Sequence, residues 1–204
     1  MTMSCQHAAF LIHPTEPMLD PQTIIRQTRT WLSSVIIALK LCPFAKREFD
    51  RDSIHYAVIE TSDLEAQLEH IIEQCRALDR DRERETSLLI FPHGLSAFET
   101  YLDVLDIATA LMTDQGYEGT YQLASFHPDY RFDGVTEADP ANYTNRSPYP
   151  MLHILREASV ERALESFPNP ENIPSRNIKL TQEMGLQAMR ALLAACYEKR
   201  RSIN

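Results

Sequence analysis

Residues 86–92 read Thr-Ser-Leu-Leu-Ile-Phe-Pro, a short apolar run that ends at a proline. Such a run is typical of a buried strand, because a proline cannot donate to the next position of the hydrogen-bond ladder. On either side, residues 62–75 and 96–116 repeat apolar side chains every three or four positions, which predicts two helices. Further out, residues 54–60 and 120–126 again favour strands. The alternation predicts an α+β (or α/β) fold, in which helices pack on a small sheet of about three strands.

Outside this central unit the pattern is mostly helical. Asp20 and Pro21 favour a helix start, since an aspartate caps the first turn and a proline needs no hydrogen-bond partner there. Helices are expected over residues 21–41, 150–157, 159–166 and 179–200, so that the C-terminal part is helical. We expect residues 1–20 to be a disordered N-terminal extension and residues 21–200 to form a single globular domain.

The charge balance excludes some classes of partner. The chain has 204 residues, with 20 Lys and Arg against 29 Asp and Glu, and a net charge of −9 at pH 7. An acidic chain repels polyanions, so we expect no nucleic-acid binding. No stretch approaches ~20 consecutive apolar residues, and the N-terminus lacks the basic and apolar regions of a secretory signal. We therefore expect a cytoplasmic protein without membrane contact, and the oligomeric state stays open.

The segment 127–156 concentrates the polar side chains that favour a binding site. It is long, and prolines and aromatic residues stiffen it, so that its hydrogen-bonding groups are arranged before a ligand arrives. The residues that we expect to bind a small-molecule ligand are Asn142, Tyr143, Asn145, Arg146, Ser147, His153 and Arg156. The alternative is that these side chains only satisfy backbone groups of the loop.

Ser147 and Pro148 have the pattern of a helix start, which points to an anionic ligand. A helix beginning there would direct free N–H groups towards Arg146, an arrangement that suits a carboxylate or phosphate. His153 and Arg156, three residues apart, would share one face of this helix. The sequence lacks the glycine-rich loops of common nucleotide-binding motifs, and it leaves any cofactor unknown.

Cys42 and His127 are the candidate catalytic residues. Cys42 precedes Pro43, and a short helix starting there would place the thiol at its N-cap, where the helix end lowers the thiol pKa. His127 follows the strand expected at 120–126 and has the chemistry of a general base for such a nucleophile. Together they suggest an enzyme that acts on a small anionic or polar metabolite. A buried thiol and a histidine that fixes a turn are the alternatives.

Two other functions compete with this hypothesis. The first is a metal-dependent enzyme or metal-binding protein that uses His127 and His153, although these residues fall in no short metal-binding motif. The second is a non-catalytic binding or assembly module. Its aromatic partner surface would consist of Tyr130, Phe132, Tyr143 and Tyr149.

Four stretches of the sequence resemble a known family. They are residues 41–44 (LCPF), 85–90 (ETSLLI), 122–130 (QLASFHPDY) and 142–157 (NYTNRSPYPMLHILRE). The chain is similar, over roughly residues 21–185, to a bacterial family known as domain of unknown function 1415. The resemblance implies no activity and no catalytic residue, so the candidate residues above rest on their side-chain chemistry alone.

Overall fold

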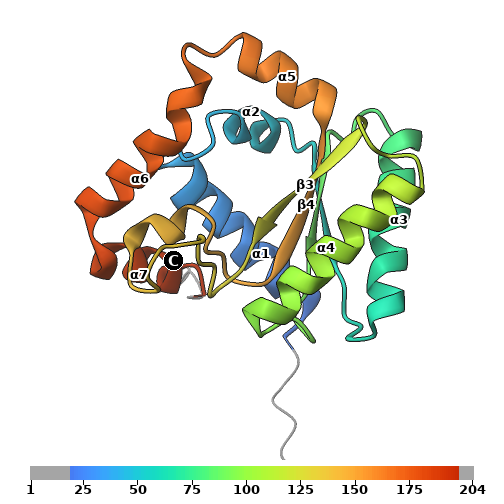
Figure 1. Ribbon diagram of the computed structural model, residues 1–204, viewed down its shortest axis with the longest axis horizontal. Helices are drawn as coiled ribbons and strands as arrows, with labels where there is room; N and C mark the ends of the chain where they lie inside the picture. The colour runs from blue at the N-terminus through green and yellow to red at the C-terminus, as the bar shows by residue number, and fades with distance from the viewer. Residues whose placement is uncertain (1–18, 198–204) are drawn as a thin grey trace, which may run out of the picture.

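The computed structural model describes residues 19–197, so residues 1–18 of the expected N-terminal extension lie outside the described residues. Within this range the chain forms seven α-helices and one mixed sheet of four strands (Figure 1). The strands are β1 (Ile54–Val58), β2 (Thr86–Ile90), β3 (Tyr121–Phe126) and β4 (Met151–Arg156). The predicted α+β class with a helical C-terminal part is confirmed, with one strand more than expected.

The strands follow the order β1-β2-β4-β3, so β2 and β4 lie in the centre of the sheet. β1 and β2 are parallel, and α3 (Leu64–Arg80) connects them across one face. β4 runs antiparallel to both β2 and β3, and α4 (Phe98–Asp114) connects β2 with β3. Each central strand therefore pairs its backbone groups on both sides, which a buried strand requires.

Helices cover both faces of the sheet, and each face has its own hydrophobic core (Figure 1). α3 and α4 pack on the face that carries Leu89 and Ile154, here termed the α4 face. α1 (Pro21–Trp31) packs on the opposite face, the α1 face, which carries Leu88 and Met151. Because side chains alternate along a strand, neighbouring residues of one strand belong to different cores.

The helix expected over residues 150–157 is wrong, because this segment is the central strand β4. Met151 and Ile154 are both fully buried, since helices cover the two faces of the strand. Such a strand lacks the alternation of apolar and polar residues, and its pattern resembles that of a short buried helix. Ser147 and Pro148 therefore start no helix.

The helix expected over residues 21–41 is confirmed at its start but is not regular throughout. Asp20 caps α1 by accepting a hydrogen bond from the first turn. The chain then continues as a π-helix, η1 (Leu32–Ile37), and leaves helical geometry near Lys40, whose φ is 54°. A separate short helix, α2 (Ala45–Asp50), follows before β1.

After β4 the chain forms α5 (Glu157–Glu165), a 3-10 turn η3 (Pro170–Asn172), α6 (Ile173–Met184) and α7 (Leu186–Ala195). The helix expected over residues 159–166 is confirmed as α5. The single helix expected over residues 179–200 is wrong within the described residues, because helix starts earlier and is divided at Gly185. Gly185 has a φ of 81°, which residues with a Cβ rarely adopt, and this ends α6.

None of the helices within residues 19–197 has the length and apolar content that a membrane span requires.

Tyr101 of α4 joins the two antiparallel strands β3 and β4. Its buried hydroxyl donates to the carbonyl of Met151 (2.8 Å) and accepts from the N–H of Phe126 (3.0 Å). Tyr101→Phe leaves both backbone groups without this partner, and we expect it to lower the free energy of unfolding by about 1–3 kcal/mol. Urea denaturation followed by circular dichroism measures the change.

Tyr117→Phe is the matched control, because the Tyr117 hydroxyl bonds Asp79 at an exposed position (3.3 Å). We expect this variant to change the free energy of unfolding by less than about 0.5 kcal/mol. Equal losses in the two variants would contradict the role of Tyr101 as a link between the strands.

Candidate functional site

The long segment expected to bind a ligand is fastened by its own polar side chains. Asn142 lies in a 3-10 helix, η2 (Pro140–Thr144), and its side chain is completely buried. It accepts a hydrogen bond from the N–H of Phe132 (3.1 Å) and donates to the carbonyl of Thr136 (2.9 Å). Asn142 therefore closes the loop that precedes η2, and its polar atoms already have partners in the chain.

Arg146 is likewise bound to the chain itself. Its guanidinium group donates to the carbonyls of Tyr130 (3.1 Å) and Glu137 (3.1 Å) and lies 4.9 Å from the ring centre of Tyr143. Arg146 is only 7% exposed, and its own carbonyl accepts from the indole N–H of Trp31 (3.0 Å). The arginine expected to bind an anion thus holds the loop together and joins it to α1.

His127, Asn145 and Ser147 lie together where this segment meets the end of β3. The N–H of His127 donates to the carbonyl of Asn145 (3.2 Å), and the N–H of Ser147 to that of His127 (3.4 Å). The Asn145 amide donates to the carbonyl of Ser125 (3.0 Å), and the Ser147 hydroxyl to that of Tyr149 (2.6 Å). The structure brings these three predicted residues together, through bonds that satisfy the backbone.

The imidazole of His127 is buried, and both of its nitrogens have partners. Nε2 lies 2.9 Å from the carbonyl oxygen of Leu95, and Nδ1 accepts from the N–H of Asp129 (3.0 Å). The ring packs against Phe98 and Tyr101 of α4, with centroids 5.2 and 5.1 Å apart. Burial lowers the pKa of His127. In this arrangement the ring has no nitrogen free to take a proton from a nucleophile.

Cys42 lies between η1 and α2, half-buried against the core of the α1 face. α2 begins at Ala45 with Phe44 at its N-cap, so the expected N-cap position of Cys42 is wrong. The expected lowering of its pKa is also wrong, because burial raises the pKa of the thiol more than nearby backbone N–H groups lower it. His127 packs against α4 on the other face, so the structure does not pair the two candidate catalytic residues.

Arg156 lies apart from the loop, at the end of β4. Its guanidinium group donates to the carbonyl of Leu78 (2.7 Å) and to the hydroxyl of Tyr121 (3.1 Å). It borders a pocket of about 530 Å³, which Arg82 also lines. In a helix, His153 and Arg156 would share a face. In the strand β4 they lie on opposite faces, because side chains alternate and the two residues are three positions apart.

Four residues that pair in register form a row across the α1 face of the sheet: Tyr56, Leu88, His153 and Ala124. Leu88 is buried, whereas His153 and Ala124 are only half-buried. Phe126, two residues beyond Ala124, contacts the same region, and its ring centre lies 6.4 Å from that of His153. The row is therefore open on the side of β3, where a small residue lies beside a histidine.

His153 has one nitrogen in a hydrogen bond and one that is free. The hydroxyl of Thr86 donates to the carbonyl of Ile154, so it must accept from Nε2–H of His153, at 2.7 Å. Nδ1 then carries a lone pair, and it forms no hydrogen bond with residues 19–197. Burial lowers the pKa of His153 to about 4, so the ring is neutral at pH 7. His153 therefore offers a hydrogen-bond acceptor.

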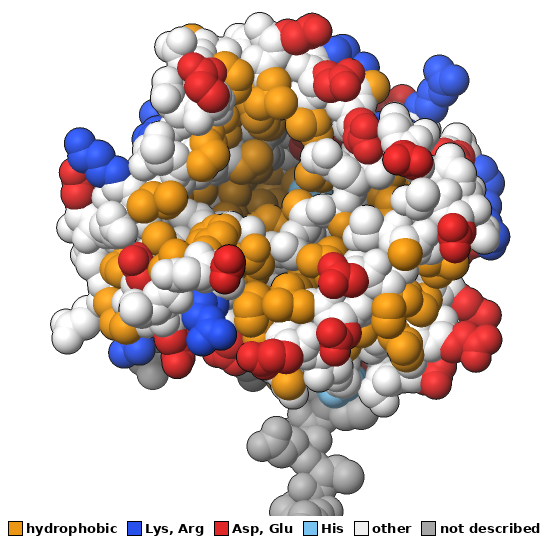
Figure 2. Space-filling model, in the orientation of Figure 1, with side chains coloured by type: hydrophobic (Ala, Val, Ile, Leu, Met, Phe, Trp, Pro, Cys, Tyr) orange, Lys and Arg blue, Asp and Glu red, His pale blue; other side chains and the backbone are white. Residues whose placement is uncertain are grey.

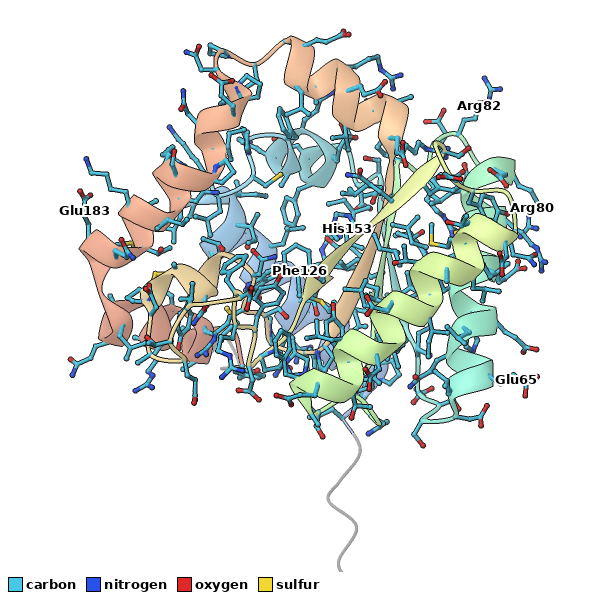
Figure 3. The ribbon with its side chains drawn as sticks, in the orientation of Figure 1. Glu65, Arg80, Arg82, Phe126, His153 and Glu183 are labelled. Atoms are coloured by element: carbon cyan, nitrogen blue, oxygen red, sulfur yellow. The ribbon has the colours of Figure 1, made fainter. Side chains whose placement is uncertain are left out.

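Figure 2 shows a hollow lined mostly by hydrophobic side chains, in the region that α5, α6 and β3 enclose in Figure 1. His153, labelled in Figure 3, lies at the wall of this hollow, and Phe126 lies nearby. Half-buried apolar residues pack against the core of the α1 face, among them Leu39, Cys42, Ala45, Phe49 and Val58. The hollow is our candidate functional site.

Contacts on both sides of η3 join the helices around the hollow to the body of the protein. The rings of Phe44 and Phe167 meet edge to face with centroids 5.7 Å apart, next to the end of α5. Asn177 of α6 donates to the carbonyl of Leu41 (2.7 Å), and Arg176 to that of Lys40 (2.9 Å). α5, which precedes both contacts, contributes no buried residue. It thus borders the hollow without packing into either core.

The described structure offers little support for the two competing functions, a metal-binding protein and a non-catalytic binding module. No group of three or more His, Cys, Asp or Glu side chains in the part of the chain described could hold a metal ion. The expected aromatic partner surface is wrong in part, because Tyr143 and Tyr149 are 4% and 8% exposed. The remaining pair, Tyr130 and Phe132, pack on each other as half-buried rings at 5.0 Å.

The residues at the hollow that sequence analysis missed are Ala124 and Phe126, together with Tyr56 at the far end of the row. The hydroxyl of Tyr56 is fully buried without a hydrogen-bond partner among the described residues, and burial raises its pKa to about 12. The signal was present in the strand pattern, since every second residue of 120–126 shares a face. The strand β4 was not predicted from the sequence, and the pairing of β4 with β3 is what places His153 beside Ala124.

Comparison with known proteins adds the family. Residues 23–191 match the family model described as "Protein of unknown function (DUF1415)". No curated protein and no solved structure matches the chain.

The depressed pKa of His153 predicts a loss of stability in acid. The unfolded chain takes up a proton near pH 6.5, whereas the folded chain resists it down to about pH 4. The free energy of unfolding should therefore fall as the pH drops below about 6.5, by up to about 1.4 kcal/mol per pH unit for this group. His153→Gln should make the fall shallower in urea denaturation between about pH 6.5 and 5.

His70→Gln, an exposed substitution on α3, should leave the pH dependence of the parent chain unchanged. If His153→Gln behaves as His70→Gln does, the neutral state assigned to the His153 ring is incorrect.

The raised pKa of Cys42 predicts slow alkylation at neutral pH. With the other three cysteines replaced by serine or alanine, we expect the rate constant for iodoacetamide to rise with a midpoint above about 8.5, the pKa of a free cysteine. The released iodide or the mass of the adduct gives the rate. Fast alkylation with a midpoint well below that value would restore Cys42 as an activated nucleophile.

Proposed function

We propose that the chain, which belongs to the DUF1415 family over residues 23–191, binds a small, largely apolar molecule in the hollow. The observation that carries the proposal is the free Nδ1 of His153 at the wall of an apolar hollow (Figures 2 and 3). Small-molecule sites are concave and mostly apolar, with a few polar groups that orient the ligand. The hollow has this composition.

The surrounding helices support an apolar ligand. Three apolar residues of α5, Val160, Ala163 and Leu164, are half-buried, and no residue of this helix is fully buried. Apolar side chains that are covered only in part gain free energy when a ligand removes them from water, about 25 cal/mol for each Å² of apolar surface. A ligand in the hollow would supply the contact that the fold leaves out.

The state of His153 supports a ligand with a hydrogen-bond donor. Nε2 is committed to Thr86, which fixes both the orientation and the tautomer of the ring. Nδ1 is therefore held in place as an acceptor, and the low pKa keeps it from becoming a donor at pH 7. A hydroxyl or N–H group of the ligand is the complementary partner.

The proposal differs from the expectation of an anionic ligand. Arg146 and Arg156 are the two arginines expected to bind an anion. Their guanidinium groups instead donate hydrogen bonds to backbone carbonyls of the chain. No charged side chain belongs to the row of residues beside His153. Binding is what we propose, and the catalytic roles of Cys42 and His127 stay predictions.

Phenol and toluene together test the proposal, because both have the size of a single ring and only phenol has a donor. We expect phenol to shift the NMR signals of His153 and Phe126 in the millimolar range of concentration. His153→Leu should weaken phenol about 2–10-fold, the value of one net hydrogen bond, and leave toluene unchanged.

Ala124→Phe should weaken both probes, since it fills the space beside His153. Ala110→Phe is the matched control, because Ala110 is exposed on α4, and it should change neither affinity. Circular dichroism checks that each variant folds. The proposal is wrong if neither probe shifts these signals, or if their binding survives Ala124→Phe.

A further inference from the structure

Another concave region lies between α3 and α4, the two helices that cover the face of the sheet opposite the hollow. It is a groove with a volume of about 880 Å³. Its apolar lining consists of Leu64, Leu68, Ile72 and Leu111. Leu64 is 42% exposed, and Leu68 and Leu111 are half-buried, so the groove presents apolar surface to the outside.

A row of carboxylates follows this apolar surface along α3. Asp63 caps the helix, and Glu65, Glu69 and Glu73 line the groove at intervals of four residues. Like charges at this spacing repel each other and destabilise a helix. Glu73 is paired with two arginines of the same helix, but no ion pair within the described chain involves Glu65 or Glu69.

The charges on α3 divide the helix into two ends. Figure 3 places Glu65 at one end and Arg80 at the other, and Arg80 pairs with Glu73 at 2.6 Å. Arg76 and His70 also border the groove, and Arg76 lies 3.9 Å from Glu73. Negative charge without a partner is therefore concentrated at the end that carries Glu65 and Glu69.

We propose that this groove docks a basic amphipathic helix of a partner protein. The leucine face of such a helix would cover Leu64, Leu68 and Leu111, as helices do when they bind in apolar grooves. Its lysines or arginines would lie beside Glu65 and Glu69 and relieve their repulsion. Apolar surface supplies affinity, and the row of carboxylates selects the charge of the partner.

Charge also argues against other occupants. The chain carries a net charge of −9, and a nucleic acid or an anionic membrane would meet the same carboxylates. A second copy of the chain, docked groove to groove, would set two acidic rows against each other, because such an interface uses the same surface twice. The inference does not depend on ligand binding in the hollow, which lies on the other face of the sheet.

Two designed peptides test the proposal on the full chain. Each has about 14 residues, enough for about four helical turns, with leucines on one face and either lysines or glutamates on the other. We expect the leucine–lysine peptide to bind, by fluorescence anisotropy, and to shift NMR signals of α3 and α4 next to the groove. The leucine–glutamate peptide should not bind.

Variants separate docking in the groove from general attraction to an acidic protein. Glu65→Lys with Glu69→Lys should weaken the leucine–lysine peptide about tenfold, because two ion pairs are replaced by repulsion. Asp103→Lys with Asp106→Lys is the matched control, since it changes the net charge equally at exposed positions of α4. We expect this control to change the affinity less than about twofold. Leu64→Ser, at an exposed position, should weaken binding about threefold or more.

The proposal is overturned if the two double variants weaken the peptide alike, or if its NMR shifts map outside α3 and α4. Binding of both peptides with similar affinity would also contradict it, because the carboxylates would then select nothing. Circular dichroism of each variant confirms that α3 is still folded.

Discussion

The two central strands, β2 and β4, have to be covered on both faces, and the rest of the structure follows from that requirement. Their side chains alternate between two cores, so helices must pack on each side of the sheet. α3 and α4 supply one layer, whereas the other layer comes from α1 and η1 near the beginning of the described chain, with residues of α6 and α7 packed against them. α5 lies beside this second layer without entering its core, and the hollow lies in the region that α5, α6 and β3 enclose (Figures 1 and 2).

The same requirement explains the polar segment between β3 and β4. This connection has to return the chain from an edge strand to the centre of the sheet, and parts of it become buried on the way. Buried backbone groups need partners, and Asn142, Asn145 and Arg146 provide them from within the segment. A dense set of polar side chains is thus the signature of a buried loop as well as of a binding site. Sequence alone does not distinguish the two.

Much of the fold could be predicted from local pattern, whereas in the candidate site His153 was predicted and its neighbours Ala124 and Phe126 were not. The strands β1, β2 and β3 and the helices α3 and α4 have clear periodicity and clear ends, such as Pro92 after β2. β4 was mistaken for a helix because Met151, Leu152 and Ile154 are buried on both faces and leave no alternation. That one error hid the surroundings of His153, because it becomes a neighbour of Ala124 only when β4 pairs with β3. Residues far apart in sequence meet through strand pairing, and no local signal reports it.

The segment α5–α6 contacts the body through Phe167, which follows α5, and through Asn177 within α6, and α5 places no side chain in either core. The α5 residues beside the hollow are therefore different from the core residues that stabilise the sheet. Substitutions along the inner side of α5 alter the size and shape of the hollow at little cost to folding, since no packed core has to adjust. If the hollow binds a ligand as proposed, such a division would let the ligand preference change while the sheet and its two cores stay the same.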